Sequence, residues 1–425
     1  MFSKRHLFSA AILVASLIAP RALAEDLRFN RYYSDGMVLQ REKPLVLRGF
    51  AQAGAEVAVS LGGQSQATEA DDSGAWSVTL EPLSANAKGQ PLTLTSGGER
   101  VALKDVQVGD VFLLARQSSI DVSLGSRMED GRGVAASAPF RVIQIETRPA
   151  ADPMADLAPD ATDGWTPLTR KSALTMSAYA YHFAMGLTEK VDVPVGIVDL
   201  DMGSGFPISW LSRDALLETS KFYGKNHADG VVSRFDKLLE LQRKGEPMPP
   251  KDPVQSDPLS YPLCPATGCN AVLHPLREIP FKGVVLQLGN NYPYMPYAEL
   301  EKDGLHLNRK ELNTAYVETY DIRKTGFRID PVTTPRVPEQ LRAVFGDASL
   351  PIGLVQTPGS ALGTLADRAA QIRELQRQMA RDGDHMGLIV PDMDSVPMSM
   401  QPADERAVGE RSVQWALGEV YGREG

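Results

Sequence analysis

The sequence predicts an α/β chain in two parts: a small all-β domain, then a domain in which helices cover both faces of a parallel sheet. Residues 25–104 contain short alternating apolar runs separated by turn signals such as Asp35-Gly36 and Gly62-Gly63. Turns that recur at roughly ten-residue spacing are typical of a small β-sandwich. From residue 105 onward, strand-length apolar runs alternate with helical patterns, and such units specify a parallel sheet wrapped by helices.

Residues 1–24 have the features of a secretory signal peptide. Lys4 and Arg5 precede an apolar run over residues 7–19, and Ala22-Leu23-Ala24 is a small-x-small cleavage site. The run is shorter than the roughly 20 residues that span a bilayer. We therefore expect cleavage near Ala24, export to the periplasm or the extracellular space, and no membrane span.

The charge balance narrows the possible partners. The chain carries a formal net charge of −9, and removing the basic signal peptide makes it more acidic. An acidic chain disfavours nucleic acid and anionic membranes as partners. Neutral substrates such as sugars remain compatible with this charge, and nothing in the sequence predicts the oligomeric state.

The chain has two cysteines, Cys264 and Cys269, close together in the sequence. In an oxidising compartment this spacing favours a small disulfide loop. The alternative is two free buried thiols. A zinc site needs more ligands, and only His274 is near, so we expect no metal.

The larger domain, residues 105–425, is predicted from the order of its apolar runs. It includes a charged helical and proline-rich insertion at residues 212–262. Strands are expected at residues 111–115, 142–145, 194–200, 282–288, 350–356 and 387–390, and helices at residues 177–191, 365–380 and 403–421.

The first strand of this domain ends at a polar corner, Arg116-Gln117-Ser118. Ligands of open parallel sheets bind beyond the carboxyl ends of the strands, so chemistry is expected there. Arg116 has two interpretations: it favours an anionic ligand, or it is a loop arginine that is either solvated or paired with a neighbouring acid. The standard G-x-S-x-G, phosphate-loop and dinucleotide motifs are absent from the sequence.

Several segments together resemble the sialate O-acetylesterase family, a branch of the SGNH/GDSL hydrolases. The resemblance covers almost the whole mature chain. It implies a flavodoxin-like, three-layer catalytic domain, no cofactor, and serine-dependent removal of acetyl groups from carbohydrates. The segments that carry it are YSDGMVLQR at residues 33–41 with Lys43-Pro44, residues 103–113, 193–198 and 282–285, and residues 407–411 with 415–417.

The family's catalytic blocks are altered in this chain. Its G-Q-S-N-M block corresponds to residues 116–120, which makes Ser118 the aligned nucleophile. Its D-I-H-P block corresponds to residues 399–402, so Ser399 stands at the acid position and Gln401 at the base position. Two further blocks retain glycines, at Gly203 and Gly289, and the nearby groups expected to supply oxyanion or binding contacts are Gly203, Ser204, Gly289, Asn290 and Asn291.

These replacements bear directly on the expected chemistry. A serine hydroxyl needs a base within hydrogen-bond reach to take its proton, and glutamine cannot serve as that base. Loss of a triad member typically costs several orders of magnitude in rate. A substitute base could come from His306, with Asp303 and Glu301 nearby to orient it. Two carboxylates after the last strand, Asp392 and Asp394, are stand-in acids or loop caps.

Two hypotheses follow. The first is a secreted carbohydrate O-acetylesterase of the sialate type that acts through Ser118, with weak or absent activity because of Gln401. The second is a non-catalytic homologue that binds a glycan or a partner in the same cleft. In both, acetylated carbohydrate is the expected ligand.

Overall fold

The computed structural model describes residues 26–116, 123–127, 134–135, 137–201, 207–218, 240, 244, 266–288, 334–358, 363–391 and 405–423. The signal-peptide prediction and most of the predicted insertion lie outside these residues. Among the described helices, none combines the length and the apolar character needed to cross a membrane.

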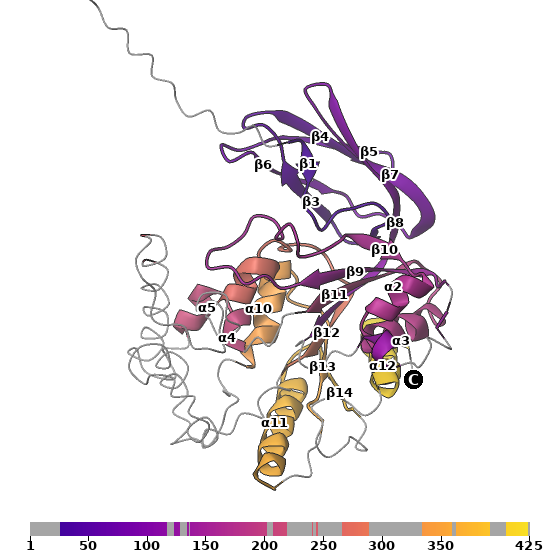
Figure 1. Cartoon of the computed structure of the whole chain (residues 1–425), viewed down its shortest axis with the longest axis vertical. Coiled ribbons are helices and arrows are strands. Elements are labelled where there is room, and N and C mark those ends of the chain that lie inside the picture. The colour runs from indigo at the N-terminus through magenta and orange to yellow at the C-terminus, as the bar shows by residue number, and fades with distance from the viewer. Residues whose placement is uncertain are drawn as a thin grey trace, which may run out of the picture.

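The amino-terminal part is built mainly from antiparallel strands (Figure 1). Alternate side chains are buried along β6, where Trp76, Val78 and Leu80 point into the core. The hairpin between β4 and β5 turns at Gly62 and Gly63, whose φ angles of 58° and 79° suit a tight two-residue turn. β1 (Arg28–Phe29), β3 (Leu45–Phe50) and β6 (Ala75–Leu80) form one sheet, and β4 (Glu56–Leu61) pairs with β5 (Gln64–Glu69) and β7 (Asn86–Ser96).

A single long strand, β8 (Glu99–Arg116), joins this part to the rest of the chain. Its first half pairs with β7 and with the short parallel strand β2 (Val38–Gln40), and its second half is the centre of the parallel sheet. The domain boundary predicted between residues 104 and 105 therefore falls inside one continuous strand. Asp105, the first residue after the predicted boundary, has a left-handed backbone conformation with φ 56°.

The larger sheet has the order β10-β9-β11-β8-β12-β13-β14. All neighbours in it are parallel except β10, which is antiparallel to β9. The predicted α/β class with a mostly parallel sheet is thus confirmed. The strands are β9 (Phe140–Glu146), β10 (Trp165–Pro167), β11 (Val195–Asp201), β12 (Gly283–Gln287), β13 (Ile352–Val355) and β14 (Met386–Ile389).

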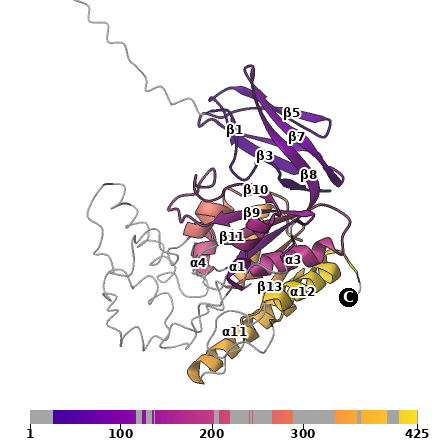
Figure 2. The same cartoon turned by 45° about the vertical axis from the view of Figure 1, so that its right-hand side comes forward.

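Helices lie on both faces of this sheet (Figures 1 and 2). Phe112 and Leu114 of β8 join the cluster of α3 (Ala178–Thr188) and α12 (Glu405–Trp415), whereas Leu113 joins the opposite cluster. The helical elements of that opposite cluster are α4 (Pro207–Trp210), α5 (Arg213–Glu218), the π-helical segment η3 (Cys269–Leu273), α10 (Arg336–Phe345) and α11 (Gly363–Asp382). Two short helices, α1 (Leu124–Arg127) and α2 (Arg170–Thr175), precede α3, and η5 (Ala416–Val420) extends α12.

Charged and aromatic contacts fix the amino-terminal part onto the larger sheet. The Asp156 carboxylate, whose side chain is 7% exposed, accepts hydrogen bonds from Arg28 and Arg31, each at 2.6 Å. The Trp165 indole N–H donates to the Tyr32 carbonyl at 3.0 Å. One apolar cluster contains residues of both parts, so the two parts pack as one body.

Residues 33–41, one of the segments that carry the family resemblance, support the start of the parallel part of β8. The Gln40 side chain accepts a hydrogen bond from the Val111 N–H at 2.8 Å. The fully buried Asp110 accepts hydrogen bonds from the Arg41 guanidinium at 2.8 Å and from the Tyr421 hydroxyl at 2.8 Å. These contacts lie at the start of the part of β8 that belongs to the parallel sheet, whereas Arg116 lies at its end. Residues 33–41 therefore stabilise the scaffold and do not belong to the candidate site.

Cys269 is a free cysteine, buried in η3. The expected disulfide is therefore absent from the structure, while Cys264 lies outside the described residues. The physical reason is placement: the Cys269 side chain packs into the apolar cluster beside Leu273. Burial raises the pKa of this thiol to about 12, because the thiolate loses its hydration.

We expect Cys269 to react slowly with a thiol reagent in the folded protein. With a pKa near 12, almost none of the thiol is ionised at pH 8, and the thiolate is the reactive form. In a Cys264→Ser variant, Ellman's reagent should label Cys269 only after urea unfolding. Rapid labelling of the native variant would contradict this burial, and a Cys264→Ser/Cys269→Ser variant gives the background.

Candidate functional site

The carboxyl ends of three neighbouring strands define the candidate site. β8 ends at Arg116, β11 at Asp201 and β12 at Gln287. β8 lies between β11 and β12, and all three run parallel. In the sequence, the predicted nucleophile follows β8, and the two predicted oxyanion segments follow β11 and β12. All three segments therefore begin at the same edge of the sheet.

Strand order marks the same place independently. β8 connects to β9, which lies beyond β11 on one side, whereas β12 connects to β13 on the other side. Neighbouring strands whose connections diverge leave a crevice between their carboxyl ends, and ligands of open α/β sheets bind in that crevice. The crevice expected here lies between the ends of β8 and β12.

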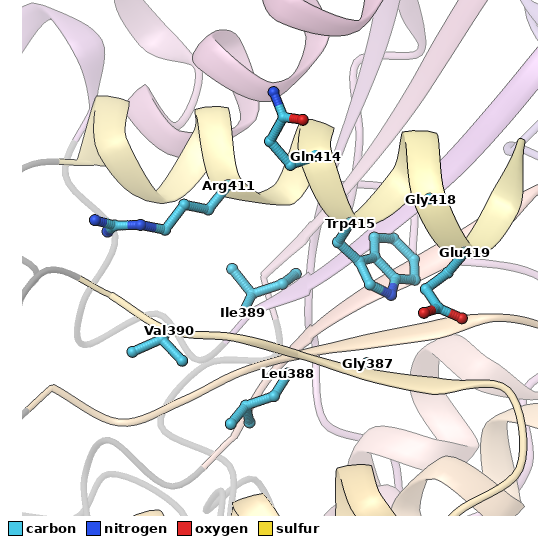
Figure 3. Close-up of a pocket in the computed structure, with 9 residues that line it drawn as sticks. All are labelled: Gly387, Leu388, Ile389, Val390, Arg411, Gln414, Trp415, Gly418 and Glu419. Carbon is cyan, nitrogen blue, oxygen red and sulfur yellow. The ribbon is translucent and has the colours of Figure 1, made fainter. Parts of the chain in front are cut away.

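The carboxyl-terminal helix brings a fourth segment to this edge. α12 runs antiparallel to β14, with Arg411 beside Val390 and Glu419 beside Gly387 (Figure 3). The first turn of α12, at Glu405, thus lies towards the carboxyl end of the strands. The predicted acid and base positions immediately precede this helix in the sequence.

All the predicted site residues lie outside the described residues, so their predicted roles remain predictions. What the structure provides is the set of strand and helix ends from which their segments depart. The residues concerned are Ser118, Ser399, Gln401, Gly203, Ser204, Gly289, Asn290, Asn291 and His306. The suggested acids Asp392 and Asp394 share this status.

Arg116, the last residue of β8, forms a buried ion pair with Asp199 of β11. The Arg116 Nε donates to Asp199 Oδ1 at 2.7 Å, and a second guanidinium nitrogen lies 2.5 Å from the same oxygen. The two side chains are 4% and 0% exposed. Of the two sequence-based interpretations, pairing with a neighbouring acid is confirmed. The Arg116 charge is enclosed and neutralised within the protein.

A second polar contact packs close to this pair. Ser412 of α12 donates to the Val408 carbonyl at 2.8 Å, and the Tyr179 hydroxyl of α3 lies 2.8 Å from Ser412 Oγ. Because Ser412 uses its only proton on Val408, Tyr179 donates to Ser412. Burial raises the pKa of Tyr179, while the nearby Arg116 charge opposes the rise. Tyr179 therefore stays protonated at neutral pH.

Sequence analysis missed Asp199 as a partner of Arg116. A signal was present: Asp199 is the only charged residue among residues 195–200, an otherwise apolar run. A carboxylate inside a strand that is buried on both faces requires a paired charge. Which charge pairs with Asp199 depends on the register of β11 against β8. In that register Arg116 lies opposite Asp201, two residues beyond Asp199, and its side chain reaches back to Asp199.

Three histidines are described, and two of them lie before strands. His274 precedes β12 and hydrogen-bonds through Nδ1 with the Met154 carbonyl at 2.8 Å, and His385 precedes β14. His182 lies on α3 with its ring 5.3 Å from Tyr181. Among the described residues, no group of three or more His, Cys, Asp or Glu side chains is placed to hold a metal ion.

The chain is 28% identical to the sialate O-acetylesterase of Rattus norvegicus over 323 residues, which is 68% of this chain and 57% of that protein. The Homo sapiens sialate O-acetylesterase is 26% identical over 301 residues, 66% of this chain and 52% of that protein. This chain resembles the sialate O-acetylesterases. It spans little more than half the length of these curated relatives.

A solved structure supports the fold as well. A carbohydrate acetylesterase from Xanthomonas citri superimposes with a TM-score of 0.66 at 23% identity, covering 93% of this chain and 76% of that one. At this identity the likeness shows a shared fold. No family model matches the chain. The resemblance to sialate O-acetylesterases predicted from the sequence is thus confirmed by similarity over about two thirds of this chain.

Proposed function

We propose that this chain is a secreted carbohydrate O-acetylesterase of the sialate type in which Ser118 is the nucleophile and turnover is weak. The observation that carries the proposal is the arrangement of β8 and β12, parallel neighbours whose connections diverge. The segment with Ser118 begins at one strand end and the segment with Gly289 at the other. Acetylated carbohydrate is the proposed substrate, which the names of the relatives suggest.

The proposal includes the domain organisation. Residues 25–104 form a β-sandwich accessory domain, and residues 105–425 form a flavodoxin-like SGNH domain, with an insertion at residues 212–262. The all-antiparallel pairing of β1, β3 and β6 supports the first assignment. Helices on both faces of a mostly parallel sheet support the second. A signal peptide over residues 1–24 directs export.

In the proposed reaction the Ser118 oxygen attacks the acetyl carbonyl and loses its proton, and the acetyl–oxygen bond to the sugar breaks so that the sugar leaves as a free hydroxyl. Water then hydrolyses the acetyl-enzyme, which releases acetate and restores the Ser118 hydroxyl. Backbone N–H groups at Gly203 and Ser204, with a side-chain amide from Asn290 or Asn291, would stabilise the oxyanion. The slow step is loss of the Ser118 proton, because Gln401 stands where the family has its base histidine and Ser399 where it has the acid.

A p-nitrophenyl acetate assay on the purified mature protein tests this function. We expect slow turnover, with kcat below the roughly 1–10³ s⁻¹ of typical enzymes, and its loss in Ser118→Ala. Ser60→Ala, which removes a hydroxyl from β4 in the amino-terminal part, should leave the rate unchanged. Turnover that survives Ser118→Ala would remove Ser118 from its role, and a rate in the typical range would show that a base is present.

The same assay decides the role of His306. We expect His306→Ala to retain the wild-type rate, because the slow step lacks a base. A loss equal to that of Ser118→Ala would instead identify His306 as the substitute base.

The second candidate function is a non-catalytic homologue that binds a glycan or a partner in the same cleft. The observation that favours it is Arg116, which stands at the family's glycine position two residues before the serine and is paired with Asp199. This function predicts that acetylated oligosaccharides raise the melting temperature without releasing acetate. Acetate release that requires Ser118 would rule it out.

A further inference from the structure

Helices α3 and α12 pack against each other on one face of the larger sheet (Figures 1 and 2). Each helix contributes a glycine to the contact, Gly186 from α3 and Gly409 from α12. A Cβ atom built on Gly186 would meet the Val413 side chain of α12, with the nearest atom at 3.0 Å. The lack of side chains at these two positions therefore lets the helices approach each other closely.

Gly409 is the tighter of the two positions. A Cβ atom built there would lie 2.7 Å from the His182 Cβ, 3.0 Å from the Phe183 nitrogen and 3.1 Å from the His182 carbonyl carbon. The favourable separation of two carbon atoms is roughly 3.5–4.0 Å. All three neighbouring atoms are fixed by the α3 backbone, so rotation of a side chain does not move them aside. An alanine at position 409 therefore fits only if α12 moves away from α3.

This helix contact extends to the end of β8. Ser412 lies three residues after Gly409 on the buried face of α12, and its Oγ lies 2.8 Å from the Tyr179 hydroxyl of α3. Burial raises the pKa of Tyr179, and the charges of Arg116 and Asp199 modify it in opposite directions. Tyr179 thus lies near the buried ion pair at the strand end. The distance between α3 and α12 is therefore set next to the strand that precedes the predicted nucleophile.

In the other direction the contact leads to the predicted acid and base positions. α12 begins at Glu405, four residues before Gly409, which is about one helical turn. Residues 399–402 contain the predicted acid and base positions, and only residues 403 and 404 separate them from α12 in the sequence. Close-packed protein interiors have low compressibility and transmit displacements. A shift of α12 at Gly409 therefore moves the helix start to which residues 399–402 are attached.

We propose that Gly409 is a positioning residue of the serine site. By letting α12 pack directly on the α3 backbone, it holds position 401 within reach of Ser118. This inference rests on the proposed function. Proton transfer requires the base within hydrogen-bond reach of the hydroxyl, and a displacement of about 1 Å caused by a remote mutation can cost about 10²-fold in rate. Because Gln401 takes no proton, the effect of Gly409 is largest once a histidine stands at position 401.

The test measures kcat for p-nitrophenyl acetate in the presence and absence of a restored acid and base. The gain is the ratio of kcat in Ser399→Asp/Gln401→His to kcat in the chain with Ser399 and Gln401, and we expect it to be roughly 10²-fold. Gly409→Ala should reduce this gain by about tenfold or more. General damage to the fold would lower both rates by the same factor and leave the gain unchanged.

Two further glycines provide a graded series of controls. Gly418→Ala adds the same methyl group to the helical extension of α12, where a Cβ atom would meet nothing within 4 Å, and should retain the full gain. Gly186→Ala adds a methyl group from the α3 side, against the Val413 side chain, and should reduce the gain less than Gly409→Ala. Circular dichroism shows which variants are folded, and Gly186→Ala decides the question if Gly409→Ala does not fold.

The outcomes separate this role from the proposed function. A gain that depends on Ser118 and persists in full in a folded Gly409→Ala variant would overturn the positioning role and leave the serine site in place. A reduction as large in Gly418→Ala would overturn it too, since that methyl group meets no neighbour. If Ser399→Asp/Gln401→His shows no gain, or a gain that survives Ser118→Ala, the proposed serine site is wrong and the role of Gly409 is overturned with it.

Discussion

Asp199→Ala is expected to lower the free energy of unfolding by about 3–5 kcal/mol, the usual cost of removing one partner of a buried ion pair. The variant leaves the Arg116 guanidinium in the core between the sheet and α3, where its side chain is 4% exposed. That charge can neither be hydrated nor lose its proton. Urea unfolding followed by circular dichroism measures the loss.

Two further variants show whether the cost comes from the unpaired charge. Replacing both partners, in Arg116→Met/Asp199→Leu, should be close to neutral, because a well-packed apolar pair often substitutes for a buried ion pair. Glu374→Ala, which breaks an exposed pair with Arg377 on α11, should leave the unfolding curve nearly unchanged. A similarly small effect of Asp199→Ala would contradict the enclosure of Arg116.

Restoring the acid and the base, in Ser399→Asp/Gln401→His, is expected to raise kcat for p-nitrophenyl acetate by roughly 10²-fold or more. A positioned histidine takes the serine proton, and the aspartate holds its ring in the productive orientation. The matched control, Ser399→Asn/Gln401→Met, introduces no base and should show the wild-type rate. A folded Ser399→Asp/Gln401→His variant without any gain would place residues 399–402 away from the nucleophile.

Local patterns predicted most of the described elements. The helix expected at residues 177–191 is α3, and the one expected at residues 365–380 lies within α11. The helix α10 was missed, although Val337, Leu341 and Phe345 recur at four-residue intervals on its buried face. The apolar face of α10 is short and follows a proline, so its local pattern is weak. Packing against the sheet stabilises this helix.

The boundary between the two parts shows what a local pattern does not reveal. Along β8, burial changes from partial up to Asp105 to continuous from Gly109 to Arg116. The first part of β8 is covered on one face of its sheet, whereas the part from Gly109 onward is covered on both faces. The sequence predicts a domain boundary at this change, and the backbone passes through it as one continuous strand. Only the pairing of β8 with β7, β2, β11 and β12 reveals the continuity.

The candidate site was predictable to the level of strand ends. An apolar run that stops at Arg116 locates a carboxyl end, and the family resemblance assigns Ser118 beyond it. The Arg116–Asp199 pair was not predictable, because it depends on the alignment of two strands separated by 78 residues of chain between Arg116 and Val195. Long-range pairing of this kind is set by tertiary packing and leaves only a weak trace in local sequence.

The proposed serine site is tested most sharply by the coupling between Ser118 and position 401. kcat/KM for p-nitrophenyl acetate is compared in wild type, Ser118→Ala, Ser399→Asp/Gln401→His and the variant that combines all three changes. If Ser118 faces the base position, the gain from the restored acid and base disappears in the Ser118→Ala background, because residues acting as one unit are strongly non-additive. A gain of the same size without Ser118 would show that the histidine acts elsewhere, and would contradict the proposed serine site.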